Sequence, residues 1–476
     1  MVRYKAFAKE LALLIESGEL RPGQRLPSVR ESSQRRGLSV STILKAYHLL
    51  EAQGLVQARQ RSGFHVSLSA DTYPQLPTSS QPELDTVEVG KSALIAQVLH
   101  ALKNDKVVPM GSAFPDPQLF PLKRLSQSLT RSMRRLEPAR AVMDITPGNP
   151  ELLRQIALRY HLHGHELDMD ELLVTHGAME ALNLCLQAVT KPGDAVVIES
   201  PSFYVCLQAL ERLGLRAIEV STDPVQGMNI EALEQAIALH RPAAIWLMSN
   251  FQNPLGSLMP ESRKRALAEL LSRHQLPLIE DDVYGELYFG ESRPAPIKAF
   301  DRDGLVLHCS SFSKCLAPGY RIGWAAAGRF WPQVQALQLG TSLSAAIPSQ
   351  LAIADYLDTG AFDTHLKGLR RELERRRDAI LGCVQQYFPL QCRVTQPQGG
   401  YFLWLELPPN FDSFRLYRAA LQHGVSIAPG SLFGVRDDIS RGLRLNYGYP
   451  SAEDAERAMQ LLARLLPVSE RKGSGD

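Results

Sequence analysis

Five short apolar runs constrain the fold of this chain more than any other feature. Each run is the length of a buried strand, and stretches with helical spacing separate them from about Val89 onward. The runs are "ELLVTHG", "AVVIESP", "AAIWLMSN", "LPLIEDD" and "LVLHCSS". Buried strands that alternate with helices are typical of a doubly wound, largely parallel sheet with helices on both faces. The sequence therefore predicts an α/β unit over most of the chain.

The chain is too long for that unit alone. At 476 residues, more than one domain is expected. The segment from "GGYFLWLELPP" to "RGLRLNYGY" has strands and helices of its own, which predicts a smaller C-terminal α+β subdomain. Near the other end, "DTYPQLPTSSQPELDTVE" holds three prolines and few apolar residues, which is typical of an extended, semi-rigid linker. We therefore expect domains at 1–70 and 93–470, joined by a linker at 71–92.

The first 70 residues carry a pattern of their own. A helical stretch containing Phe7 and Leu11 is followed by a turn, a second helical stretch, and a third at about 40–51. Two short alternating segments then flank Ser62 and Gly63, as in a hairpin. This order predicts a winged helix-turn-helix. The alternative is a small helical cap on a larger enzyme, with a merely solvated polar face.

Charge favours a phosphate-bearing partner for this N-terminal part. Residues 1–70 carry 11 Lys and Arg against 5 Asp and Glu, whereas the whole chain has a net charge of only +2. The sequence resembles a GntR-type DNA-binding domain through "GELRPGQRLPSVR", "STILKAYHLLEAQG" and "SGFHV". That resemblance implies double-stranded operator DNA as the partner and a set of DNA-contacting residues. They are Arg30, Ser39, Ser41, Thr42, Lys45, Arg61 and Gly63.

Residues with reactive or hydrogen-bonding side chains come directly after the predicted strands. Ligands of open α/β sheets bind beyond the carboxyl ends of the strands. The segments found there are "HGAMEAL", "SPSFY", "FQNPLG", "DDVYGELY" and "SFSKCLAPGYRIGW". They supply a lysine, an acid, two hydrogen-bonding groups, an aromatic ring and a glycine turn that opens a helix and forms an anion cradle. This set suits pyridoxal phosphate. The alternative for Lys314 is a buried lysine paired with a carboxylate.

A second resemblance covers residues 93 to 468. The motifs "NPLG", "DDVY", "SFSKCLAPGYRIGW" and "GLRLNY" are similar, in that order, to those of a fold-type I (class I/II) aminotransferase. The resemblance implies that Lys314 forms the Schiff base with pyridoxal phosphate, and that Arg444 clamps the carboxylate of an amino acid. It also implies cofactor contacts. Ser311, Ser313, Arg321 and the amides of Ala178 and Met179 would hold the phosphate; Asp281 would pair with the ring nitrogen; Asn253 and Tyr284 would bond the phenolic oxygen; and Phe203 would stack on the ring.

Some positions depart from the family pattern. The segment "HGAME" lacks the side-chain hydroxyl or amide that many relatives place in the phosphate cradle, and Leu255 replaces the commoner threonine. Asp282 competes with Asp281 for the role at the ring nitrogen, and Asp281 is preferred for its spacing to Tyr284. The loop "YHLHGHELD" brings three histidines, which we interpret as a solvated loop because no carboxylate or cysteine has matching metal-ligand spacing. No metal is therefore expected.

The two resemblances together indicate the MocR subfamily of transcriptional regulators. For that subfamily we expect pyridoxal phosphate as cofactor, an amino acid or amine as effector, and a homodimer that addresses two half-sites. One alternative is an active aminotransferase with an accessory DNA-binding head. Because the Schiff-base lysine is intact, residual transamination is compatible with either function. A third reading is a DNA-binding protein whose body only dimerises it.

The remaining sequence features concern location. The N-terminal residues are interrupted by charges, and there is no apolar run of about 18 residues. The six cysteines show no CxxC spacing, so neither a disulfide framework nor a zinc knuckle is indicated. We therefore expect a soluble, cytoplasmic protein that makes no membrane contact.

Overall fold

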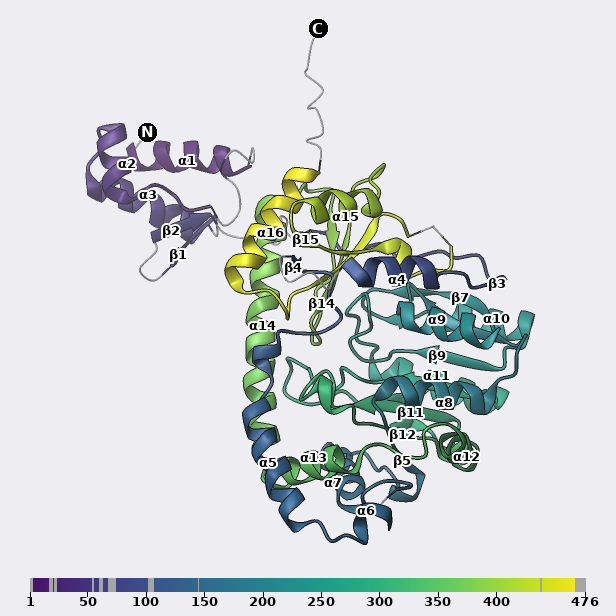
Figure 1. The fold of residues 1–476 in the computed structure, drawn as a ribbon. Helices are drawn as coiled ribbons and strands as arrows, with labels where there is room; N and C mark the ends of the chain where they lie inside the picture. The colour runs from purple at the N-terminus through teal and green to yellow at the C-terminus, as the bar shows by residue number, and fades with distance from the viewer. Residues whose placement is uncertain are drawn as a thin grey trace.

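The structure of the protein is a computed structural model. It describes residues 3–16, 20, 24–53, 55–59, 63–66, 74–101, 107–143, 145–436 and 439–466. The N-terminal helices and hairpin form a unit of their own, distinct from the larger body (Figure 1).

The N-terminal unit has the elements of a winged helix-turn-helix. They are α1 (Arg3–Glu16), α2 (Val29–Arg36), α3 (Val40–Ala52), β1 (Val56–Arg59) and β2 (Gly63–Val66). The two strands pair antiparallel. The fully buried Tyr47 packs against Phe7 and Phe64, and its hydroxyl donates to the carbonyl of Pro27. The predicted order of helices and hairpin is confirmed, and the unit has its own apolar core.

The stretch predicted as a linker lies against the body. Of its residues, 71–73 are outside the described part, and 74–85 have no helix or strand. The Thr78 backbone and side chain donate to the carboxylate of Glu406, and Ser79 donates to Asp223 at 3.0 Å. Then β3 (Thr86–Glu88) pairs antiparallel with β7 (Arg216–Asp223). The prediction of a linker is therefore wrong for residues 86–88, which form an edge strand of the body's sheet. Hydrogen bonds from hydroxyl and backbone groups attach this stretch, together with the buried Pro77 and with Leu84, which packs against the core that contains α10 and α11.

The body is built on a nine-stranded sheet. In addition to β3 and β7 it contains β5 (Leu172–Thr175), β6 (Ala195–Ser200), β8 (Gly227–Met228), β9 (Ala244–Leu247), β10 (Leu278–Asp281), β11 (Val306–Ser311) and β12 (Gly323–Ala326). The order is β3-β7-β6-β9-β10-β11-β12-β5, with β8 beside β7. Strands β7, β6, β9, β10 and β11 are mutually parallel, whereas β12 is antiparallel to both neighbours. The five predicted apolar runs all form strands of this sheet.

Helices cover both faces of the sheet. Along β6, Val196 and Ile198 belong to the apolar core that also contains the buried residues of α8 (Ala178–Val189) and α9 (Tyr204–Leu213). Val197 belongs to a second core with α10 (Ile230–His240) and α11 (Glu261–His274). This alternation along a strand is the pattern of a doubly wound fold, as predicted.

The remaining helices frame the sheet and carry the chain to the C-terminal subdomain. They are α4 (Ser92–Ala101), α5 (Leu122–Arg135), α6 (Arg140–Met143), α7 (Pro150–Leu162), α12 (Trp331–Thr341), α13 (Ile347–Asp358), α14 (Ala361–Tyr387), α15 (Ser413–Gln422) and α16 (Ala452–Leu465). Short 3-10 turns lie at Pro117–Leu119, Met169–Glu171, Ile297–Phe300, Pro318–Tyr320, Gly328–Phe330 and Gly430–Leu432. Among the described residues, no helix is long and apolar enough to cross a membrane.

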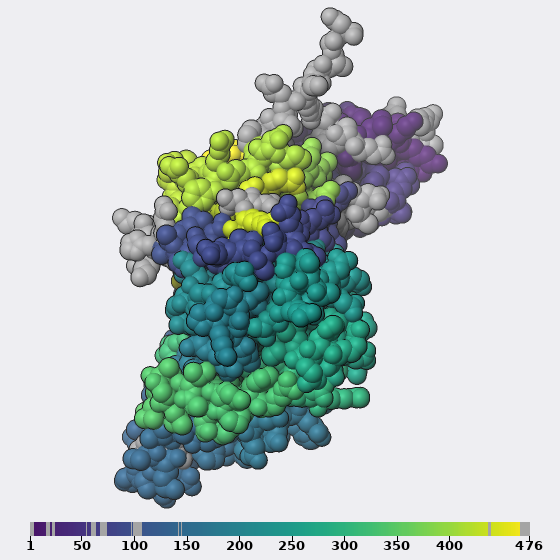
Figure 2. Space-filling view, turned by 90° about the vertical axis from the view of Figure 1, so that its right-hand side faces the viewer, coloured from purple at the N-terminus to yellow at the C-terminus, as the bar shows by residue number. Residues whose placement is uncertain are grey.

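The C-terminal subdomain has its own antiparallel sheet. Its order is β13 (Arg393–Val394), β14 (Phe402–Glu406), β17 (Gly442–Asn446) and β16 (Ala428–Pro429). An early segment, β4 (Val108–Pro109), pairs parallel with β15 (Val425–Ser426) of this subdomain. Figure 2 shows α4, in dark blue, between the yellow-green subdomain and the teal sheet unit. Residues 107–116 are thereby placed where the two parts of the body meet.

Candidate functional site

A pocket of about 1050 Å³ opens at the carboxyl ends of the parallel strands. Most of the body residues singled out from the sequence line it: Ala178, Met179, Phe203, Asp281, Tyr284, Ser311, Ser313, Lys314 and Arg321. They come from the last residues of β10 and β11 and from the segments that follow β5, β6, β10 and β11. The sheet topology, rather than proximity along the chain, brings them together.

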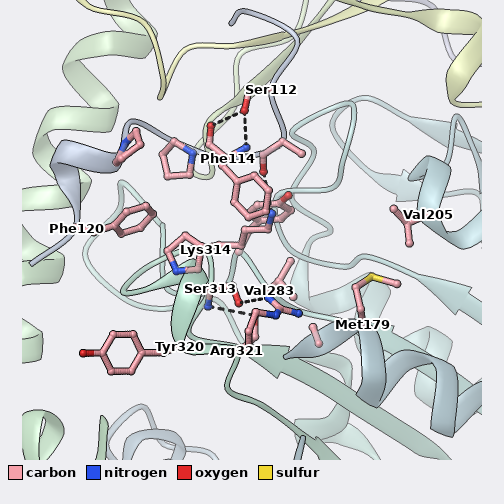
Figure 3. A pocket seen from close by; sticks show the side chains of 18 of the residues that line it. Ser112, Phe114, Phe120, Met179, Val205, Val283, Ser313, Lys314, Tyr320 and Arg321 are labelled. Carbon is pink, nitrogen blue, oxygen red and sulfur yellow. Dashed lines mark hydrogen bonds between the residues drawn. The ribbon is translucent and has the colours of Figure 1, made fainter. Parts of the chain in front are cut away.

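Lys314 lies in the middle of this pocket (Figure 3). Its Nζ donates to the carbonyl of Ala113 at 2.8 Å and lies 3.8 Å from the centroid of the Phe114 ring. Burial of the amine, reinforced by the nearby charges of Arg444 and Arg321 and opposed by Asp281, lowers the pKa of Lys314 to about 7. A primary amine with this pKa is neutral, and hence nucleophilic, near physiological pH. Among the described residues, the hydrogen-bond acceptor of Nζ is a backbone carbonyl and no carboxylate forms an ion pair with it, unlike the alternative of a structural lysine paired with a carboxylate.

The two neighbouring aspartates have different surroundings. Asp281 lines the pocket and is 1% exposed, and its Oδ1 has no hydrogen-bond partner in the described structure. Burial and the negative charges of Asp282 and Glu280 raise the pKa of Asp281 to about 7. Asp282 instead accepts hydrogen bonds from Arg293 at 2.6 Å and from Asn250 at 2.8 Å. Only Asp281 is placed to meet a ligand in the pocket.

One end of the pocket is an anion cradle. The first amides of α8, at Ala178 and Met179, have no acceptor within the helix, and Gly177 before them brings no capping side chain. Gly177 has a φ of +79°, and a Cβ there would lie 2.5 Å from Nη2 of Arg321. Arg321 donates to the Ser313 hydroxyl at 3.2 Å and to the His176 carbonyl at 3.0 Å. Amides, hydroxyls and a guanidinium together suit a phosphate group.

Asn253 and Arg444 are neighbours that lie behind this pocket and do not line it. Both side chains are fully buried, and Arg444 Nη1 donates to Asn253 Oδ1 at 2.9 Å. Among the described residues, Asn253 Nδ2 and Arg444 Nε have no hydrogen-bond partner. Burial lowers the pKa of Arg444, which packs between the rings of Phe402 and Phe433. Each unpaired buried donor costs about 1–3 kcal/mol, which a polar ligand would offset.

The segment Gly111–Phe114 is a part of the site that the sequence did not identify. The carbonyls of Gly111 and Ser112 accept from Arg444 Nη2 at 2.8 and 3.2 Å, and the carbonyl of Ala113 accepts from Lys314. Asn446 also donates to the carbonyls of Ser112 and Phe114. The glycine and prolines of "MGSAFPDP" indicate a non-helical segment, but no local signal places it against residues some 330 positions away.

The residues predicted to contact DNA lie on the N-terminal unit. Ser39 caps α3, accepting from the Thr42 amide and contacting the hydroxyls of Ser41 and Thr42. Arg30 on α2 and Lys45 on α3 are exposed. Gly63 begins β2 with a φ of +86°. Arg61 lies outside the described residues.

The stretch interpreted as a histidine-bearing loop begins inside a helix: His161 lies in the last turn of α7, and His163 and His165 follow it. Within the described part of the chain, no group of three or more His, Cys, Asp or Glu side chains is arranged to hold a metal ion. His163 packs edge-on against Tyr288. Burial lowers the pKa values of His163 and His165.

Comparisons with known proteins agree with this architecture. Residues 116–462 match the family model "Aminotransferase class I and II", and residues 3–66 match "Bacterial regulatory proteins, gntR family". The chain is 45% identical over 466 residues to the uncharacterized HTH-type transcriptional regulator YdcR of Escherichia coli, covering 98% of this chain and 99% of that protein.

Solved structures similar to the body are aminotransferases. A multiple substrate aminotransferase from Thermococcus profundus superposes with a TM-score of 0.73 at 27% identity, covering 79% of this chain and 94% of that one. The α-aminoadipate aminotransferase LysN from Thermus thermophilus, complexed with N-(5'-phosphopyridoxyl)-L-leucine, gives a TM-score of 0.70 at 29% identity, covering 79% and 96%. The predicted fold-type I body, which is the fold of pyridoxal phosphate enzymes, is thus confirmed.

Head and body together have the MocR-like arrangement that the sequence predicted. The chain belongs to the class I and II aminotransferase family and, through its N-terminal unit, to the gntR family of bacterial regulatory proteins: it is a GntR-type transcriptional regulator fused to an aminotransferase-like domain.

Proposed function

We propose that this regulator binds pyridoxal phosphate in the pocket around Lys314 and responds there to an amino acid or amine. The observation that carries the proposal is the set of buried polar atoms without partners around one amine of lowered pKa. Asp281 Oδ1, Asn253 Nδ2 and Arg444 Nε all lack a partner in the described structure. A buried polar atom in a folded protein normally has a hydrogen-bond partner, so these atoms indicate a polar ligand.

The residues present fit the cofactor. Asp281 would accept a hydrogen bond from the ring nitrogen, Asn253 and Tyr284 would bond the phenolic oxygen, and Phe203 would stack on the ring. Ser311, Ser313, Arg321 and the amides of Ala178 and Met179 would hold the phosphate. When bound through Lys314, the cofactor supplies an electrophilic carbon that exchanges amines and an electron-withdrawing ring. The chain's own residues orient that group and keep the ring nitrogen protonated.

The pKa values give a testable pH dependence. Below about pH 7 Lys314 is protonated and unreactive; above it the amine is neutral. Asp281 loses its proton as the pH rises through about 7, and the carboxylate then pairs with the protonated ring nitrogen. Both changes favour attachment at higher pH. We expect the rate at which cofactor-free protein reacts with pyridoxal phosphate, followed by absorbance, to rise through about pH 7 and then level off. A rate that climbs up to about pH 10, as for an ordinary lysine, would contradict this assignment.

Arg444 would bind the effector's carboxylate. In the structure, the guanidinium of Arg444 donates to the uncharged backbone carbonyls of Gly111 and Ser112. A carboxylate of the effector would replace these carbonyls as the acceptor. A charge-assisted contact of this kind contributes about 1.5–3 kcal/mol, so Arg444→Ala should weaken amino-acid binding roughly 10- to 100-fold. Cofactor absorbance should remain. The measurement is a spectral titration with an amino-acid panel.

Two further variants separate this effect from misfolding. Arg444→Lys keeps a buried cation but not the planar fork, and should show an intermediate loss. Arg457→Ala removes an exposed arginine of α16 and serves as the control. Equal affinities in wild-type and Arg444→Ala protein would show that another residue holds the carboxylate.

The head would bind operator DNA, and we propose that two copies of the chain form a homodimer that places two heads on two half-sites. Exposed Arg30 and Lys45 would contact DNA, together with Ser39, Ser41 and Thr42 at the start of α3. Arg61 and Gly63 would lie at the wing. The test is fluorescence anisotropy with DNA from upstream of the protein's own gene, with and without pyridoxal phosphate and an amino-acid panel. DNA binding that never responds to these ligands would leave the body as a dimerisation unit.

Aminotransferase activity is the second candidate. It is favoured by the presence of Lys314, Asp281 and Tyr284 in one pocket with Arg444 behind it. Production of a 2-oxo acid from an amino acid over many turnovers, with a second 2-oxo acid present to accept the amino group, would favour the enzyme over the regulator if DNA binding were also independent of ligand.

A further inference from the structure

The pocket extends beyond the part assigned to the cofactor. On one side of Lys314 lie Met179 and Val205, and on the other lie Phe120 and Tyr320 (Figure 3). We call the second side the apolar arm. We take the arm to consist of Phe120 and Tyr320 together with four further apolar or aromatic residues of the pocket lining, namely Phe114, Pro115, Leu122 and Tyr449. These residues come from the segment that leads into α5 and from its first residue, from the turn before β12 and from the loop after β17, so the arm is assembled from three separate parts of the chain.

The apolar arm has no charge available for a ligand. Among the described residues that line the pocket, the charged side chains are Asp281, Lys314 and Arg321, and the proposed function uses all three for the cofactor. Arg376 lies near Tyr449 but contacts Asp116 at 3.2 Å and Glu372 at 2.7 Å. It also donates to the carbonyls of Gly448 and Tyr449.

Arg124, the arginine of α5 near the arm, does not line the arm either. Arg124 lines a separate surface hollow together with Thr364 and His365. A second carboxylate on the ligand would therefore enter the apolar arm without a cation to pair with, which is unfavourable for a desolvated charge.

The position of Lys314 indicates which part of a bound amino acid would enter the arm. An effector amino acid would react at the Lys314 end of the cofactor, with its carboxylate toward Arg444. Its side chain would then occupy the part of the pocket that neither the cofactor nor the carboxylate fills. The cofactor would occupy the side of Met179, whose amide belongs to the proposed phosphate cradle, so the space left for the side chain would be the apolar arm. The Phe114 ring, 3.8 Å from Lys314 Nζ, stands at its entrance.

We infer that the effector is an amino acid or amine with a large apolar or aromatic side chain, which packs among Phe114, Phe120, Tyr320 and Tyr449. This inference rests on the proposed function, since it names the class of effector for the same site. Burial of a large apolar side chain favours binding by roughly 10- to 100-fold. L-Phenylalanine, L-tyrosine and L-leucine should therefore bind that much more tightly than L-alanine, and more tightly than L-glutamate or L-aspartate.

The test is a spectral titration of cofactor-loaded, full-length protein with these six amino acids, which measures binding without requiring turnover. In wild type, the phenylalanine-to-alanine affinity ratio should be at least about 10. Tyr320→Ala and the milder Phe120→Leu should lower that ratio toward one. Tyr320→Arg adds a cation and should shift preference toward glutamate. Phe300→Ala, which alters a ring stacked under Arg265 away from the pocket, should leave the ratio unchanged.

The possible outcomes distinguish a failure of the inferred effector class from a failure of the proposed effector site. Tighter binding of glutamate or aspartate than of phenylalanine in wild type would overturn the inference and leave the effector site in place. A ratio that stays the same in the Tyr320 and Phe120 variants would also overturn it. A cofactor spectrum that responds to none of the amino acids would overturn the effector role itself, and the inference with it.

Discussion

Replacing Lys314 with alanine should abolish covalent attachment of pyridoxal phosphate. After incubation with the cofactor and reduction with borohydride, the wild-type chain should carry one pyridoxyl group, on Lys314, and the Lys314→Ala chain should carry none. The reason is that Lys314 is the lysine among the described residues that line the pocket, and burial lowers its pKa to about 7. Mass spectrometry of the reduced peptides measures the result.

The same variant should still hold some cofactor without a covalent bond. The anion cradle of Ser311, Ser313, Arg321 and the α8 amides does not depend on Lys314. Lys191→Ala, at an exposed position after α8, is the matched control and should carry the adduct as wild type does. An undiminished adduct in Lys314→Ala protein, or an adduct on another lysine of the wild type, would show that the pocket has been misassigned.

The double substitution Arg30→Ala with Lys45→Ala should lower DNA affinity about 100-fold or more at moderate salt. Each charged contact to a phosphate or base contributes about 1.5–3 kcal/mol, and losses at separate positions add approximately. Both residues are exposed, on α2 and α3 of the N-terminal unit. The dependence of affinity on salt should also weaken, because fewer counterions are released. Fluorescence anisotropy across a salt series measures both quantities.

Two controls accompany this prediction: a variant at another exposed lysine of the head, and the absorbance spectrum of the bound cofactor. Lys9→Ala removes an exposed lysine of α1 and should change affinity little. The absorbance of bound cofactor should be the same in the double variant as in wild type, because the head and the pocket are built from separate parts of the chain. An affinity within twofold of wild type would mean that other residues of the head contact DNA.

Much of this protein could be predicted from its sequence. Strands buried on both faces leave uninterrupted apolar runs, so "AVVIES" and the other runs identified the sheet. The residues after those runs then identified the pocket, because parallel strands end at the same edge. In the head, the order of the helices and the hairpin around Gly63 followed from local patterns.

Other features depend on contacts that leave no local signal. The pairing of β4 with β15 places the carbonyls of Gly111 and Ser112 beside Arg444. Every residue has a backbone carbonyl, so the residue types at these positions do not predict the contact. Residues 74–88 have the composition of a linker, yet the body binds them through hydroxyl and backbone groups and through β3. The spacing to Tyr284 was enough to prefer Asp281 over Asp282, but the hydrogen bonds from Arg293 and Asn250 that occupy Asp282 are tertiary contacts that the sequence did not reveal.

The central claim is that a ligand in the body changes DNA binding by the head. A ligand shifts DNA affinity only if it binds more tightly to one of two arrangements of the protein. The most direct measurement is the ratio of DNA affinities with and without pyridoxal phosphate plus the amino acid of highest affinity, in wild type and in Lys314→Ala protein. We predict a ratio that differs from one by at least about fivefold in wild type, the lower end of typical allosteric coupling, and a ratio near one in the variant, which should still bind the DNA. Equal ratios in the two proteins would contradict the account.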